Sequence, residues 1–73
     1  MDSNDEKILV EFAKRIVKLR REKNLSQEQL AHKSNLHRTH VGMIERAERN
    51  ITLTTIEKLA NGLEVSIDEL FRF

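Results

Sequence analysis

A polar segment near the middle of the chain carries side chains that could recognise another molecule through hydrogen bonds. Residues 36–46 read LHRTHVGMIER, with only a few large aliphatic residues among charged and polar ones. An arginine such as Arg38 can donate two parallel hydrogen bonds to O6 and N7 of guanine, and a threonine such as Thr39 can place its methyl group against a thymine methyl. These residue types are suited to reading the edges of base pairs.

Other kinds of chemistry find little support in the sequence. The chain has no cysteine, so a disulfide framework and a thiolate metal site are excluded and the reducing cytoplasm is the expected setting. His37 and His40 are three residues apart, but two imidazoles without a third ligand do not make a persuasive metal site. There is no nucleophile with a suitable base, no glycine-rich phosphate loop and no pair of carboxylates among apolar residues. We therefore expect neither an enzyme nor a metal or cofactor site.

The distribution of charge favours a partner that carries many negative charges. The net charge is +1, yet residues 1–13 carry −3, residues 14–49 carry +6 and residues 50–73 carry −2. A basic centre between acidic ends is the electrostatic pattern of a small nucleic-acid binder. Lysine and arginine are also ordinary surface residues, so charge alone does not exclude a solvated helical face.

Length and composition predict a single small helical domain over residues 1–73. The absence of proline, the two glycines and the 34% of charged residues suit helices. Folding of so short a chain buries only about 60% of the unfolded surface, so a partner subunit would add stability. No apolar run approaches the roughly 20 residues of a membrane span, and no basic start precedes an apolar signal core, so neither insertion nor export is expected.

Helical periodicity and capping motifs predict an all-α fold of five helices. The helices are expected over residues 4–23, 27–34, from 38 onward, from 53 to about 63, and 67–71. Ser26 with Gln29 is a capping box at the second helix, and Ser66 with Glu69 is another at the fifth. Asn35 suits the left-handed residue of a tight turn, and Gly62 suits the stop of the fourth helix. Two short helices joined by about three residues form a helix-turn-helix, whose second helix enters the major groove.

Apolar residues at helical spacing predict the core and, by exclusion, the exposed face. The core is expected to contain Ile8, Leu9, Phe12, Ile16, Leu19, Leu30, Ala31, Leu36, Val41, Ile44, Leu53, Ile56, Leu59, Ala60, Leu63 and Leu70. The side chains left facing outward on the third helix are Arg38, Thr39, His40, Gly42, Met43 and Arg46. Val10 and Val17 lie seven residues apart on the opposite side of the first helix, with no expected partner within the chain.

A long segment resembles a known family of DNA-binding domains. LSQEQLAHKSNLHRTHVGMIERAERNITLTTIEKLANGLEVSIDELF is similar to the lambda-repressor-like helix-turn-helix domain of the Xre family, and the resemblance covers about residues 12–71. The matching motifs are the SQEQLA opening, the IER.ERN close of the third helix and LANGLEVSIDELF. The LHRTHVG.IER.ERN version looks most like the controller proteins of restriction-modification systems, small stand-alone activators and repressors. The resemblance implies a transcriptional regulator that binds double-stranded DNA.

The resemblance also implies roles for individual residues. Arg20 and Glu45 match a pair that joins the first and third helices, and a guanidinium suits two hydrogen bonds to one carboxylate. Base reading falls to Arg38, Thr39 and Met43, with His40 beside them. Phosphate binding falls to Gln27 at a helix N-terminus. By their own chemistry, the residues around the loop after the third helix also suit phosphate binding, with an idle surface side chain as the alternative for each: Arg46, Arg49, Asn50 and Thr52. Structural roles remain open for Gly42 at a tight helix crossing and for Met43 at the core edge.

The sequence departs from the family at both ends of the third helix. His37 stands at the N-cap, where the family prefers Ser, Thr or Asp. Ala47 replaces a common glycine, so the helix is expected to continue toward Glu48 before it turns.

The end of the chain carries more apolar surface than one small domain easily covers. We expect a homodimer through the fourth and fifth helices, because operator binding by this motif normally matches a two-fold axis of the protein. The residues expected at the interface are Val65, Ile67, Phe71 and Phe73. The alternative is that Phe71 or Phe73 folds back on the first helix.

A second functional class stays open. The helix-turn-helix could serve as a protein-interaction module or as the antitoxin of a toxin pair, with an incidental basic centre. Salt-dependent binding to duplex DNA would separate the two classes. With no second domain expected, no small-molecule effector is expected either.

Overall fold

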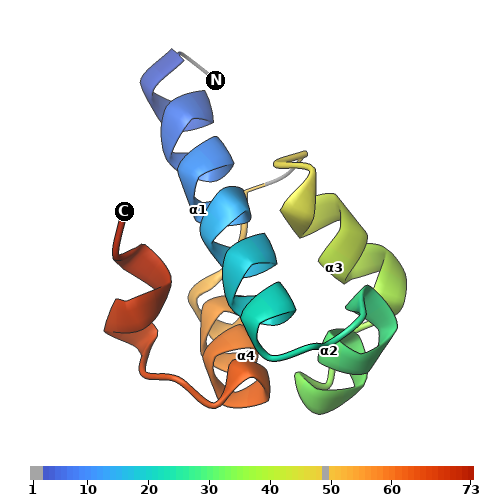
Figure 1. Ribbon diagram of the computed structural model, residues 1–73. Helices are drawn as coiled ribbons and strands as arrows, with labels where there is room; N and C mark the ends of the chain where they lie inside the picture. Colours follow the sequence, from blue (N-terminus) through green and yellow to red (C-terminus); the bar gives the residue numbers. More distant parts are fainter. Residues whose placement is uncertain (1–2, 49) are drawn as a thin grey trace.

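Helices are the only regular secondary structure in the described part of the chain. A computed structural model describes residues 3–48 and 50–73. Within these residues the elements are α1 (Ser3–Glu22), α2 (Gln27–Lys33), α3 (Arg38–Glu45), α4 (Leu53–Leu63) and the 3-10 helix η1 (Ile67–Phe71), as Figure 1 shows. An all-helical fold is therefore confirmed for the described residues.

The last element differs from the α-helix that was predicted there. Residues 67–71 wind into a 3-10 helix, so the described fold has four α-helices instead of five. The Ser66 side chain accepts no hydrogen bond from a backbone N–H, and its hydroxyl lies 3.5 Å from a carboxylate oxygen of Glu69. The capping box predicted here is therefore wrong. Without that cap the short segment winds into the tighter helix that commonly serves such pieces.

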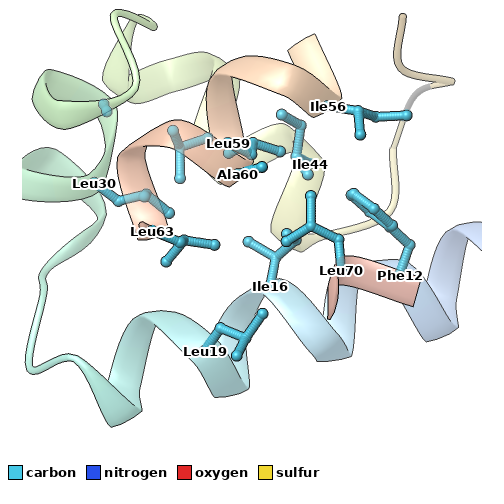
Figure 2. Packing of buried hydrophobic residues seen from close by; sticks show 12 residues of the cluster. Phe12, Ile16, Leu19, Leu30, Ile44, Ile56, Leu59, Ala60, Leu63 and Leu70 are labelled. Atoms are coloured by element: carbon cyan, nitrogen blue, oxygen red, sulfur yellow. The ribbon is translucent and has the colours of Figure 1, made fainter. Parts of the chain in front are cut away.

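One hydrophobic core joins all five elements. The side chains of Phe12, Ile16, Leu59, Leu63 and Leu70 point toward one another between α1, α4 and η1 (Figure 2). The core side chains that solvent does not reach at all are Ile16, Leu30, Val41, Leu59, Leu63 and Leu70. Burial of each such side chain stabilises the fold by about 1.5–3 kcal/mol. The core thereby holds α2 and α3 in fixed positions.

Two residues predicted in the core are exposed instead. Ile8 is 53% exposed, because the N-terminal turns of α1 extend beyond the other helices (Figure 1). Leu53 is 83% exposed. It is the first residue of α4, and a helical side chain leans toward the N-terminus, so no packed turn lies beneath it.

Helix α4 ends one residue later than its glycine. Glu64 takes the left-handed conformation, with φ 59°, and Gly62 has no positive φ. The prediction that Gly62 provides the stop is therefore wrong. Gly62 is buried where α4 meets the end of α2, and a β-carbon on it would lie 2.0 Å from Oγ of Ser34. This glycine is needed for close approach of two helices.

Helix α3, in contrast, ends earlier than predicted. It stops at Glu45, and Ala47 has φ 57°. The expected continuation toward Glu48 is wrong, because the chain reverses at Ala47 to reach α4. Left-handed backbone brings the β-carbon of an L-residue close to the following carbonyl oxygen, at a cost of about 1–2 kcal/mol.

Replacing Ala47 with glycine should therefore stabilise the protein. We expect the free energy of unfolding to rise by about 0.5–1 kcal/mol, since relief of strain outweighs the larger entropy of the unfolded glycine chain. The midpoint of urea unfolding measures the change. Ala60→Gly, inside α4, is the control and should lower the midpoint. A lower midpoint for Ala47→Gly would contradict the strain at this residue.

Candidate nucleic-acid interface

The start of α2 is fixed by the capping box that the sequence predicted. The backbone N–H of Gln29 donates to Oγ of Ser26 at 3.0 Å, and the N–H of Ser26 donates to Oε1 of Gln29 at 2.8 Å. Both partners are therefore satisfied, and the prediction is confirmed.

The turn between α2 and α3 has the predicted left-handed residue. Asn35 has φ 55°, and beyond it the N–H of Leu36 donates to the carbonyl oxygen of Ala31 at 2.9 Å. This bond spans the end of α2 and closes it sharply. The two helices therefore meet as a helix-turn-helix, with α3 directed away from α2 (Figure 1).

His37 caps α3 with its imidazole. Its Nδ1 accepts a hydrogen bond from the backbone N–H of Thr39 at 3.1 Å. A ring nitrogen thus takes the place of the hydroxyl or carboxylate oxygen that usually satisfies such an N–H. The cap fixes the first turn of α3, which contains Arg38 and Thr39.

Helix α3 presents a buried and an exposed face. Val41 and Ile44 are buried as predicted. Arg38 and Thr39 are exposed, and the two other residues expected to read bases, His40 and Met43, are half-buried. Two of the four candidates are therefore accessible on α3, and the other two are accessible only in part.

Gly42 does not lie on the exposed face. It is buried, and a β-carbon on it would lie 3.0 Å from Nη1 of Arg46 and 3.8 Å from Oε1 of Gln27. The expectation of an outward Gly42 is wrong, because the arginine side chain folds back over it. This glycine leaves room for the guanidinium.

Arg38 is held loosely over the start of α2. Its Nη1 lies 3.6 Å from Oε2 of Glu28, and the two side chains are 68% and 76% exposed. Exposed ion pairs contribute little to stability. The guanidinium is therefore free to exchange this carboxylate for a base edge.

A buried network connects the ends of three helices. Nε and Nη2 of Arg20 donate to Oε2 and Oε1 of Glu45, at 2.7 Å and 3.0 Å. The predicted pair is present and bidentate, and the two side chains are 12% and 5% exposed. The side chain of Gln27 donates to the same carboxylate at 2.9 Å. The network fixes the end of α3 against the end of α1 and the start of α2.

This network bears on the phosphate contact expected of Gln27. The side-chain nitrogen of Gln27 donates toward Glu45, and an amide nitrogen carries a second hydrogen. A phosphate at the start of α2 could therefore use that hydrogen or the backbone N–H groups there. No local pattern indicated this contact with Glu45, because the two residues are eighteen positions apart.

The segment after α3 carries the other phosphate-binding candidates. Arg46 and Asn50 are exposed, and Arg49 lies outside the described residues. Arg46 forms an ion pair with Glu48, and the hydrogen bond between them raises the pKa of the guanidinium. Thr52 uses its hydroxyl oxygen to cap α4, so a phosphate would have to share it.

An apolar groove lies between α4 and η1. Leu53, Ile67 and Phe71 line it and are 83%, 47% and 40% exposed. Its volume is 320 Å³. Helical spacing had placed Leu53 in the core, so the sequence did not predict it on this exposed surface.

The aromatic residues at the end of the chain partly fold back on α1. The Phe71 ring centroid is 5.2 Å from that of Phe12 and 6.3 Å from that of Phe73. Phe73 lies against α1 beside Ile8, and Val65 packs on the core. The four predicted interface residues therefore do not share one surface, and only Ile67 and Phe71 line the groove between α4 and η1.

The described residues can also be compared with what a metal site and a membrane-spanning helix require. They contain no group of three or more His, Cys, Asp or Glu side chains placed to hold a metal ion. No helix of the described part of the chain has the length and apolar character that crossing a membrane requires.

This arrangement of α2 and α3 is the structure of a helix-turn-helix DNA-binding protein. The family model described as Helix-turn-helix, HTH_3, matches residues 16–70, and the chain belongs to this family.

Relatives within the family narrow this class. The chain is 57% identical over 47 residues to Control protein C.SmaI of Serratia marcescens, and the match covers 64% of this chain and 56% of that protein. It is 44% identical over 65 residues to Control protein C.MunI of Mycoplasma sp, with 88% of each chain covered. The crystal structure of the restriction-modification controller protein C.AhdI from Aeromonas hydrophila aligns with TM-score 0.84 and 49% identity, over 86% of this chain and 96% of that one. The protein is thus a helix-turn-helix transcriptional regulator of the controller type.

Proposed function

We propose that the protein binds a two-fold DNA operator as a homodimer and controls restriction-modification genes in the cytoplasm. Each protomer places α3 in the major groove of one half-site, and no small-molecule effector takes part. The residues that read bases are Arg38, Thr39, His40 and Met43. The residues that hold phosphates are Gln27, Arg46, Arg49, Asn50 and Thr52.

The exposed first turn of α3 carries this proposal. Arg38 and Thr39 are exposed there and His37 fixes their backbone, while Val41 anchors the opposite face in the core. A recognition helix reads base edges mainly with its N-terminal residues. Control of restriction-modification genes is proposed from the names of the relatives. Since the match spans little more than half of C.SmaI, the activity of that whole protein is not assumed.

Replacing Arg38 with alanine should selectively weaken binding to the operator. We expect a loss of about 1–3 kcal/mol per half-site, because two hydrogen bonds to a guanine are removed. Arg46→Ala is the comparison, since an arginine that binds a phosphate serves every sequence alike. Arg46→Ala should weaken binding to operator and scrambled duplexes equally. It should also lower the slope of log affinity against log salt concentration by about 0.9 for each phosphate that the variant no longer neutralises.

Titrations of both duplexes over a salt series, monitored by fluorescence anisotropy, measure these effects. If Arg38→Ala left the ratio of operator to scrambled affinity unchanged, Arg38 would bind a phosphate instead of a base. Failure of the parent protein to bind any duplex in a salt-dependent manner would favour the protein-interaction alternative.

The groove between α4 and η1 should form the centre of the dimer. Leu53, Ile67 and Phe71 expose apolar side chains there, and their burial would favour association. Sedimentation equilibrium at micromolar concentration should give about twice the monomer mass of 8.6 kDa. Ile67→Asp should shift the equilibrium to the monomer, and Ile8→Asp, at an exposed site on α1, should not. A parent protein that stays at 8.6 kDa with and without DNA would refute the dimer.

A further inference from the structure

A groove between α1 and the end of α3 lies apart from the proposed dimer contact, and of its lining residues only Arg46 is among the proposed DNA contacts. Its volume is 730 Å³, within the range of about 300–1,000 Å³ that is typical of binding sites. The floor contains the small or aliphatic side chains Val10, Ala13, Val17 and Ala47. Helices α1 and α3 pack against each other at this point (Figure 1).

The floor explains the two valines for which the sequence offered no partner. Val10 is 41% exposed, and Val17 is half-buried. They lie seven residues apart and therefore on one face of α1, two turns from each other. Their spacing matches that of two anchor side chains on a helix laid along the groove.

The rim of the groove is basic. Lys14, Lys18 and Arg21 follow one another at intervals of four and three residues along α1, and all three are exposed. None of the ion pairs formed among the described residues includes them. The groove contains two acidic residues, Glu22 and Glu45, and Glu45 is paired with Arg20. The surplus positive charge would attract carboxylates on either side of an apolar ligand face.

We propose that this groove binds an acidic amphipathic helix of a partner protein. Aliphatic side chains of the partner, spaced over two turns, cover Val10 and Val17, and flanking glutamate or aspartate side chains meet Lys14, Lys18 and Arg21. Duplex DNA is the competing occupant, because its phosphates could also use the basic rim. A phosphate backbone makes no use of the aliphatic floor, and Arg46 is the one proposed DNA contact among the lining residues, so the groove favours the peptide.

The test uses the full chain and a designed probe. The probe is a 16-residue peptide of leucine, glutamate and alanine, with leucines on one helical face and glutamates beside them. A scrambled peptide of the same composition and a random 20-base-pair duplex are the comparison ligands. Backbone ¹H–¹⁵N spectra identify the binding surface, and fluorescence anisotropy gives the affinity. We expect the patterned peptide alone to shift the amide signals of residues 10–22. The signals of residues 45–48 include Arg46, a proposed phosphate contact, and should respond to the duplex as well.

Variants of the floor and rim distinguish the outcomes. Val10→Ser with Val17→Ser should weaken peptide binding by about tenfold or more. Lys14→Glu with Lys18→Glu, both at exposed sites, should weaken it and remove its salt dependence. Ile8→Ser, on the same helix but outside the groove, should leave it unchanged. Three outcomes would each overturn the proposal. The valine variant could bind the peptide as tightly as the parent, the amide signals of residues 10–22 could shift with random duplex but not with peptide, or no binding could be seen at millimolar peptide.

Discussion

Replacing Glu45 with alanine should lower the free energy of unfolding by about 3–5 kcal/mol, the cost of breaking a buried ion pair by removing one partner. The carboxylate accepts hydrogen bonds from Nε and Nη2 of Arg20 and from the side chain of Gln27. Its loss would leave a guanidinium that is only 12% exposed without its counter-charge. A domain of this size has a total stability on the order of 5 kcal/mol, so the variant should be largely unfolded in moderate urea.

Chemical unfolding of the parent and variant, followed by circular dichroism, measures this loss. Asp68→Ala is the matched control, because Asp68 also pairs with an arginine, but the two side chains are 71% and 63% exposed. The control should keep the unfolding midpoint of the parent, since exposed pairs contribute little. Equal midpoints for Glu45→Ala and Asp68→Ala would show that the buried network does not stabilise the fold.

Gly62→Ala should destabilise the protein by about 3 kcal/mol, near the upper end of the cost of overpacking a core. The added β-carbon would lie 2.0 Å from Oγ of Ser34 and 3.0 Å from its Cα and Cβ. Rotation of the hydroxyl relieves only the first of these contacts, because the backbone of α2 holds the other two atoms. The end of α2 would then have to move away from α4.

Gly42→Ala, at the other glycine of the chain, should change the stability in the opposite direction. Its β-carbon would meet Nη1 of Arg46 at 3.0 Å, and this atom is the end of a flexible side chain that can move. Alanine also favours a helix over glycine, so we expect a gain of about 0.5–1 kcal/mol. Urea midpoints of the two variants should therefore fall on either side of the parent. A midpoint for Gly62→Ala at or above that of the parent would contradict the close approach of α2 and α4.

Local sequence patterns predicted the helix-turn-helix because its determinants are local. Ser26 and Gln29 are three residues apart, and Asn35 adopts its left-handed conformation within the turn itself. The burial of Leu30, Val41 and Ile44 follows from helical spacing around that turn. The pair of Arg20 and Glu45 came from the resemblance to a family, since no local rule connects residues twenty-five positions apart.

The predictions failed where contacts between distant segments decide the conformation. Gly62 was assigned to a helix stop, but its position against Ser34 uses its lack of a side chain for packing. Ala47 was expected to continue a helix, but the path to α4 requires a reversal there. Periodicity also does not show where a helix leaves the body of the domain, and so Ile8 and Leu53 were placed in the core.

On the proposed function, the division of α3 into two faces makes binding specificity replaceable without loss of the scaffold. Val41 and Ile44 supply the packing of this helix, and Glu45 locks its end, whereas Arg38 and Thr39 are exposed. Substitutions at these two exposed positions therefore cost little folding energy. Duplicated copies of such a gene can diverge toward new operators while both products remain folded, and a library randomised at positions 38 and 39 offers the same route to designed regulators.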